Sequence, residues 1–317
     1  MKKIFKRISA ITMAATMATT LAISAIAVGF DSSVEKISAP LVYSPEFPEA
    51  YIIPNESAEW LTSDSTTQTV SATVFVEEEY GLDDNGNPIT TSSRLLSKDE
   101  VLAIGLDNFG DMEDARQKAV LETLQTRAAT NARGNLTISF SGTYSISGNS
   151  VSCDLSGSAS WTFDTWGQFN GKSNPATGSD YMGVSWSGGF TTSSSPTISA
   201  TSSFPIYEPP VLNMCDSVPN AGRVWEFREA WTGGGMMGQS VSVYLKSIDV
   251  NVKLIKNKRD NSGNTAEAVL KYIHTYELAH GSISITASSS GVVGGGFSLS
   301  SVDKQWSLVC TVTGIPS

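Results

Sequence analysis

The stretch Leu136–Phe163 constrains the fold most, because apolar and small polar residues alternate along it almost without interruption. Successive side chains of a β-strand point to opposite faces, so a period of two predicts strands with one apolar and one polar face. A short turn at Gly148-Asn149 divides the stretch into two runs. Two such runs joined by a Gly-Asn turn predict an antiparallel hairpin. Serine and threonine supply almost all of its polar face.

Strand patterns also dominate the rest of residues 134–317. Alternation recurs in Gln239–Leu254, where a one-residue slip of phase at Lys246-Ser247 predicts a β-bulge. It recurs again in Leu270–Leu278, and turn-forming residues separate the runs with no helical pattern between them. We therefore predict a mainly β fold for this region, as an antiparallel β-sandwich or a partly open barrel.

Residues 28–133 form an acidic region with 19 acidic and 7 basic residues (net −12), against 12 and 10 (net −2) in residues 134–317. A proline-rich lead is followed by one predicted hairpin, whose first strand is Val70–Val76. Ser97–Glu100 has the sequence of a capping box, which predicts one or two helices over about 97–132. The sharp change in charge predicts a domain boundary between residues 133 and 134.

Residues 1–27 have the parts of a secretory signal peptide: a basic start, an apolar stretch and the cleavage site Ala25-Ile26-Ala27. An uncleaved membrane anchor is the alternative, since the apolar stretch approaches the length of a membrane span. Cleavage would release a secreted, extracellular protein, and would take the net charge from −10 to −14 by removing four basic residues. Nucleic acids are therefore not expected partners, because clustered basic charge supplies most of the affinity for them.

Three cysteines remain after cleavage, namely Cys153, Cys215 and Cys310. So small and odd a number argues against a fold held together by disulfides, and it allows at most one bridge within the chain. The sequence leaves open which two would pair. Cys153 shares the apolar parity of its strand, which favours a buried core residue.

The motifs of common catalytic and cofactor sites are absent from the sequence, including the nucleophile elbow, the zincin helix, the Cys-x-x-Cys pair and the phosphate-binding loop. His274 and His280 would lie about 20 Å apart in one extended strand, too far to share a metal ion unless the chain turns between them. Glu226 and Glu229 would face opposite sides of a strand. We therefore expect no catalytic residue, no cofactor and no metal site. The alternatives are Cys215 paired with His274 or His280, and calcium at the acidic turn 83–87.

Aromatic residues are the more informative feature. Trp161 follows the apolar parity of its strand and is expected in the core, whereas Trp166 lies off that parity beside a glycine, which favours an exposed ring. Exposed rings among neutral polar side chains suit the apolar faces of sugars, or a protein partner. The predicted ligand-binding residues are Trp166, Phe169, Tyr181 and Trp186, with burial in the core as the alternative for each. The leading hypothesis is a secreted, non-enzymatic binding protein that recognises a glycan or protein at a cell surface.

The segment 281–302 supports a second hypothesis, because it is almost uncharged, alternates polar with apolar residues and has a glycine-rich middle that suits a hairpin tip. Such alternation is typical of strands that line a membrane β-barrel. The chain would then be a β-pore-forming or self-assembling, toxin-like protein, with 281–302 as the inserting hairpin and the helical segment 97–132 as its cover. Only this hypothesis makes a membrane the partner. An ordinary sandwich hairpin is the simpler alternative, and a secreted hydrolase with scattered carboxylates is the third hypothesis.

Overall fold

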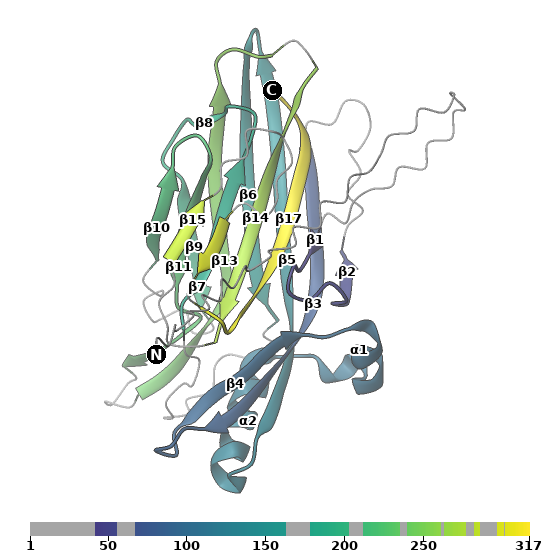
Figure 1. Ribbon diagram of the computed structural model, residues 1–317, viewed down its shortest axis with the longest axis vertical. Coiled ribbons are helices and arrows are strands. Elements are labelled where there is room, and N and C mark those ends of the chain that lie inside the picture. Colours follow the sequence, from purple (N-terminus) through teal and green to yellow (C-terminus); the bar gives the residue numbers. More distant parts are fainter. Residues whose placement is uncertain are drawn as a thin grey trace, which may run out of the picture. The chain divides into compact units, whose positions relative to one another are not determined.

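Antiparallel β-sheets account for most of the computed structural model, which confirms the predicted mainly β, sandwich-like fold (Figure 1). The chain divides into two units, residues 1–38 and 39–317. The described residues all belong to the second unit, so the predicted signal peptide lies outside them, and the structural statements below refer to them alone. They are residues 42–55, 67–162, 178–202, 212–234, 240–260, 263–276, 282–285, 297–300 and 302–317.

The predicted hairpin lies inside a nine-stranded sheet. Its main path runs in the order β12 (Ala230–Gly234), β13 (Ser240–Lys256), β6 (Ser150–Trp161), β5 (Thr130–Ser147), β3 (Thr67–Leu82) and β2 (Ile52–Pro54). Three further strands pair beside this path: β4 (Pro88–Leu95) with β3, and both β8 (Thr191–Thr192) and β9 (Thr197–Ser202) with β13. β5 and β6 pair from Leu136 opposite Trp161 to Ser147 opposite Ser150, as the alternation predicted. Their turn contains Gly148 at a φ of 58°, a conformation that glycine adopts at little steric cost.

β13 contains the predicted bulge. Its pairing with β9 changes register between Leu245 and Ser247, where the alternation in the sequence slips by one residue. Leu245 and Ile248 are both almost fully buried, on either side of the shift. The extra residue therefore lets one long strand keep its apolar side chains on the same face of the sheet.

A six-stranded sheet forms the second layer. Its order is β1 (Val42–Tyr43), β17 (Gln305–Pro316), β14 (Thr265–Thr275), β7 (Asp180–Trp186), β11 (Gly222–Phe227) and β10 (Asn213–Val218). All of its pairings are antiparallel. Strands from the start and the end of the described chain are neighbours here, since Val42 lies opposite Cys310.

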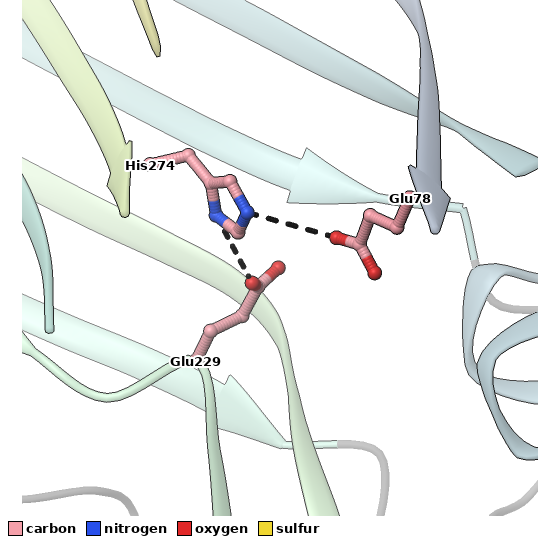
Figure 2. Close-up of side chains that lie close together, drawn as sticks. All are labelled: Glu78, Glu229 and His274. Carbon is pink, nitrogen blue, oxygen red and sulfur yellow. Dashed lines mark ion pairs between the residues drawn. The ribbon is translucent and has the colours of Figure 1, made fainter. Parts of the chain in front are cut away.

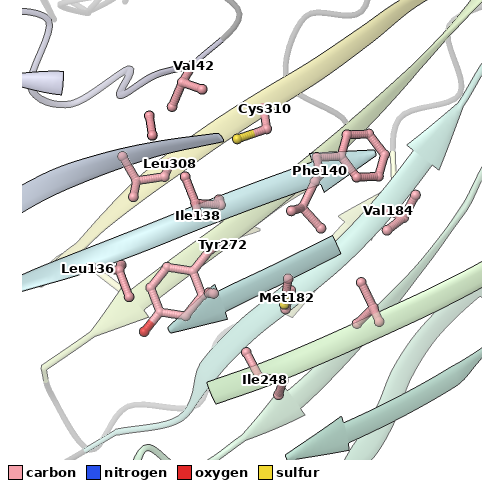
Figure 3. Packing of buried hydrophobic residues seen from close by; sticks show 14 of the residues in the cluster. Val42, Leu136, Ile138, Phe140, Met182, Val184, Ile248, Tyr272, Leu308 and Cys310 are labelled. Carbon is pink, nitrogen blue, oxygen red and sulfur yellow. The ribbon is translucent and has the colours of Figure 1, made fainter. Parts of the chain in front are cut away.

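The apolar faces of the two sheets enclose one large core. Figure 3 shows Leu136, Ile138 and Phe140 of the nine-stranded sheet in the same cluster as Tyr272 and Leu308 of the six-stranded sheet. Full burial of one such side chain contributes about 1.5–3 kcal/mol, so this cluster supplies most of the driving force for the fold.

Two glycines allow the sheets to approach closely. A Cβ added at Gly157 would lie 2.6 Å from Leu270, and one added at Gly142 would lie 3.0 Å from Val312. Both glycines lie on the inner face of the nine-stranded sheet, where side chains of the opposite sheet occupy the space that a larger residue would need.

The cysteines form no bridge. All three are free: Cys153 and Cys310 are buried and Cys215 is exposed. Burial raises the pKa of the Cys153 thiol to about 12. The core therefore owes its stability to packing and not to a disulfide.

The acidic region contributes both helices and strands. Ser97 and Glu100 form the predicted capping box at the start of α1 (Lys98–Ile104). This helix ends where Gly105 adopts a φ of 91° and a short 3-10 turn follows. α2 (Met112–Thr126) ends at Arg127, in the left-handed region. Among the described residues, no helix is long and apolar enough to cross a membrane.

The change of charge near Gly134 does not coincide with a break in the structure. Gly134 lies inside β5, and β3 pairs with β5 from Thr67 opposite Thr143 to Tyr80 opposite Thr130. Strands on both sides of the predicted boundary therefore belong to one sheet.

Candidate functional site

The predicted aromatic site lies only partly within the described residues. Trp166 and Phe169 fall outside them. Tyr181 and Trp186 lie on β7, and each has 3% of its surface exposed. Trp186 belongs to the main core, and its indole nitrogen donates a hydrogen bond to a backbone carbonyl. Neither ring offers a face to a ligand, so the aromatic hypothesis depends on Trp166 and Phe169.

The outer face of the nine-stranded sheet carries an array of small polar side chains, called the hydroxyl face below. Strands β3, β5, β6, β13 and β9 contribute three residues each, and the pairing registers align them in three rows. The rows are Thr73, Thr137, Ser160, Ser247 and Thr201; Ser71, Ser139, Ser158, Asp249 and Ser199; and Thr69, Ser141, Ser156, Asn251 and Thr197. All are partly or fully exposed, and Asp249 alone among them carries a charge.

Such a face can form many hydrogen bonds without selecting for charge. A hydroxyl group both donates and accepts, as the Thr73 and Thr137 hydroxyls do with each other at 3.0 Å. Neighbouring strands are about 4.8 Å apart, and alternate residues along a strand are about 6.6 Å apart. The hydroxyl face therefore repeats at regular intervals in two directions, which suits a ligand that itself repeats.

A second constellation lies inside the protein and is called the buried charge cluster below. It contains Glu78 of β3, Arg116 of α2, Asp180 of β7, Glu229 between β11 and β12, and His274 of β14. The exposed fraction of each side chain is 5% or less. Figure 2 shows Glu78 and Glu229 approaching the His274 ring from two sides.

Arg116 joins the two glutamates. Its Nε donates to Glu78 Oε2 at 2.9 Å, and its Nη2 donates to Glu78 Oε1 at 2.6 Å and to Glu229 Oε1 at 3.1 Å. The guanidinium also lies over the Trp161 ring, 4.7 Å from its centroid. Trp161 is 3% exposed, as its parity predicted. Arg116 therefore has both ionic and aromatic neighbours in a buried site.

His274 is surrounded by carboxylates. Its Nδ1 lies 3.2 Å from Asp180 Oδ2 and 3.3 Å from Glu229 Oε2, and its Nε2 lies 3.6 Å from Glu78 Oε1. Burial by itself would lower the pKa of His274, but Asp180 and Glu229 raise it to about 10. Asp180 in turn accepts hydrogen bonds from the Tyr272 hydroxyl at 2.6 Å and the Thr275 amide at 2.9 Å.

Some polar atoms of the cluster have no hydrogen-bond partner among the described residues. They include Arg116 Nη1, Glu229 Oε2 and His274 Nε2. One ligand atom from each of Glu78, Glu229 and His274 lies within 4.8 Å of the other two, a spacing that a metal ion could use. No metal site was expected from the sequence. The cluster is closed to solvent, so a substrate could not reach it without a rearrangement.

One sequence signal could have found part of this cluster. Val74, Val76, Glu78 and Tyr80 share one parity in β3, so a glutamate occupies a position where the pattern demands an apolar residue. His274 likewise follows Tyr272 in the buried parity of β14. Glu226 lies half-buried on β11, whereas Glu229 lies in the connection that follows this strand.

The ends of the segment 281–302 form an outer hairpin, β15 (Ser282–Ile285) paired with β16 (Phe297–Ser300). This pair is a separate two-stranded sheet. Phe297 and Leu299 are buried against Tyr181 and Ile273, on the face of the six-stranded sheet that points away from the main core. The Lys271 amino group donates to Phe297 O at 3.1 Å and adds a polar tether.

A cleft of about 600 Å³ lies between the helices and β5. Its charged lining consists of Asp107, Asp111, Asp114, Lys118, Glu122 and Arg133, which leaves an acidic excess. Asp114 pairs with Lys118 across one helical turn. These charges are typical of the exposed surface of a helix. Among the described residues that line the cleft, no nucleophile lies beside a general base.

Comparison with known proteins adds no assignment to this geometry. The chain matches no protein-family model, and the search of curated proteins finds none that is similar to it.

Proposed function

We propose that the chain is a secreted, non-enzymatic binding protein that attaches to a neutral polysaccharide at a cell surface through the hydroxyl face. The observation that carries this proposal is the registered array of fifteen polar side chains, of which only Asp249 is charged. A polymer of neutral sugars presents hydroxyl groups at regular intervals. Each hydrogen bond in water contributes little, but many of them on one repeating ligand act together.

The aromatic prediction complements this proposal. Trp166 and Phe169 follow β6, one of the strands of the hydroxyl face, in the sequence. A ring beside the face would add stacking on a sugar to the hydrogen bonds. The closed geometry of the buried charge cluster is a further support, since its carboxylates do not face solvent where a hydrolase would need them.

The test measures binding to insoluble cell-wall polysaccharides and to a glycan array. The double variant Ser139→Glu/Ser158→Glu places two carboxylates in the middle row of the hydroxyl face. Desolvation of these charges should weaken binding at least tenfold, corresponding to about 1.4 kcal/mol. Trp166→Ala measures the contribution of the aromatic ring in the same assay.

The matched control is Thr265→Glu/Ser298→Glu, which adds the same charge at two exposed positions outside the hydroxyl face. The control should bind as the natural chain does. A chain that binds no glycan, or whose binding survives both the hydroxyl-face variant and Trp166→Ala, would contradict the proposal. Binding to protease-sensitive surface components only would favour a protein ligand instead.

A second candidate function, insertion of the segment 281–302 into a membrane, has one specific support. The outer hairpin forms its own sheet, so it could leave the sandwich without breaking the ladders of the two large sheets. Its apolar residues face the protein and alternate with serines. A transmembrane β-strand needs about 9–11 residues, and a 22-residue hairpin can provide two such strands.

Dye release from liposomes tests this second function. The chain should release dye, and Ile283→Asp, which places a charge on the lipid-facing parity, should abolish the release. Ser284→Asp on the opposite parity is the matched control and should retain it. Intact liposomes at high protein concentration would remove this candidate.

A further inference from the structure

We propose that Glu78, Glu229 and His274 form a metal site that holds one divalent transition-metal ion of the Zn²⁺ or Mn²⁺ kind. All three residues are buried, and their ligand atoms lie within 4.8 Å of one another. They converge from β3, the β11–β12 connection and β14, as Figure 2 shows. Because β3 and β14 belong to different sheets, an ion here would connect the two layers of the sandwich.

His274 is oriented as a metal ligand is in other proteins. A metal-binding histidine commonly donates one ring N–H to a carboxylate, which leaves the other ring nitrogen for the metal. Asp180 Oδ2 lies 3.2 Å from Nδ1 and is held by the Tyr272 hydroxyl. Nε2 makes no hydrogen bond among the described residues and lies 3.6 Å from Glu78 Oε1. Two ligands about 2.1 Å from one tetrahedral ion are roughly 3.4 Å apart, close to this separation.

Glu229 gives the second, independent indication. Its Oε2 is buried and has no hydrogen bond to a described residue. Its neighbour at 3.3 Å is His274 Nδ1, which also lies 3.2 Å from Asp180 Oδ2. A carboxylate out of water is costly unless it is compensated. Glu229 and His274 are neighbours in this buried site, and each has a polar atom without a hydrogen bond to a described residue. These two atoms therefore point to a ligand that binds both side chains.

The charges of the cluster also fit a divalent ion. Glu78, Asp180 and Glu229 contribute three carboxylates, against one guanidinium from Arg116, and this acidic excess favours a cation. Arg116 Nη2 holds one oxygen of each glutamate and makes no bond to Glu229 Oε2. Carboxylates with one imidazole suit Zn²⁺ and Mn²⁺ better than the soft metals that prefer thiolates.

The experiment unfolds the whole chain in EDTA and refolds it with Zn²⁺, with Mn²⁺ or without metal, because a closed site takes up its ion during folding. Elemental analysis after dialysis should find about one ion per chain, and the melting temperature should rise with the bound metal. Glu229→Gln keeps the side-chain shape and an oxygen for Arg116. It should lower the metal affinity at least tenfold. Glu122→Gln in the acidic cleft is the matched control and should bind as the natural chain does.

Co²⁺ provides a readout that needs no variant, which matters if Glu229→Gln does not fold. The natural chain refolded with Co²⁺ should show the visible absorption of a nitrogen- and oxygen-ligated ion. A chain that retains no metal and melts at the same temperature with and without it would overturn the proposal, and protonated His274 would then be the second cation of the cluster. Equal metal retention by the natural chain and Glu229→Gln would also overturn it, since the ion would lie elsewhere.

Discussion

The hydroxyl face and the buried charge cluster place polar groups in opposite ways. The face exposes fifteen polar side chains with one charge, whereas the cluster encloses five ionisable side chains that are each at most 5% exposed. Buried charges must find their partners within the protein, because leaving them unpaired is costly. Exposed hydroxyl groups keep their hydrogen-bonding capacity for water or a ligand. In this molecule charge therefore organises the interior, and neutral polar groups cover one large outer surface.

The largest effect should come from breaking the cluster. Arg116→Met leaves Glu78 and Glu229 buried without their shared donor, and should lower the free energy of unfolding by about 3–5 kcal/mol. Arg94→Met removes a similar pair at the surface, where the arginine is 39% exposed, and should cost about 1 kcal/mol or less. Urea unfolding of both variants measures the difference. Equal losses would show that burial does not determine how much these ion pairs contribute to the free energy of unfolding.

The next effect compares the two faces of one strand. Gly157→Val places a side chain where Leu270 already lies, 2.6 Å from the new Cβ, and should destabilise the protein by about 1–3 kcal/mol. Ser158→Val is adjacent on β6 but lies on the hydroxyl face, so it should change stability by about 0.5 kcal/mol or less. Thermal unfolding of the pair decides whether the sheets are as closely packed at this point as the structure indicates.

A smaller effect should appear on acidification. The hydrogen bond from Arg94 and those from Ser97 lower the pKa of Glu100 from its ordinary 4.5 to about 2. This carboxylate therefore contributes stability above pH 4.5 that is lost as the pH falls through 2. Because its side chain is 40% exposed, the contribution should be roughly 0.2–1 kcal/mol.

Glu100→Gln isolates this contribution. The stability difference between the natural chain and the variant, measured in urea, should shrink between neutral pH and about pH 2. A difference that does not change with pH would mean that packing around Glu100, and not its charge, accounts for the effect.

The smallest effect should come from the hydroxyl face itself. Ser139→Ala and Ser141→Ala each remove one partly exposed hydroxyl group and should change the free energy of unfolding by less than about 0.5 kcal/mol. A loss well above that value would show that the face stabilises the fold. Its hydroxyl groups would then be less available to a ligand than the comparison implies.

Much of the fold follows from short-range patterns. Alternation predicted the β5–β6 hairpin and the phase slip near Lys246 predicted the bulge in β13, because both depend on neighbours in the sequence. The capping box at Ser97 is local in the same way. The change of charge near Gly134 falls inside β5, since composition can change along a strand without ending it.

The buried charge cluster could not be predicted because its residues come from five distant parts of the chain, between Glu78 and His274. The burial of Tyr181 could not be predicted for a different reason. Every residue of β7 is buried, since the main core covers one face of this strand and the outer hairpin covers part of the other. A single strand pattern does not indicate that a third layer exists.

The position of β17 has a consequence for how the protein folds. This strand lies between β1 and β14 and supplies Trp306, Leu308 and Val312 to the core. Folding must therefore bring together residues more than 260 positions apart, as the pairing of Val42 with Cys310 requires. Loops of that length close slowly, and folds dominated by distant contacts are slow to form. A chain in which β17 is not yet paired would expose the edges of β1 and β14 and an open core, and such features favour aggregation.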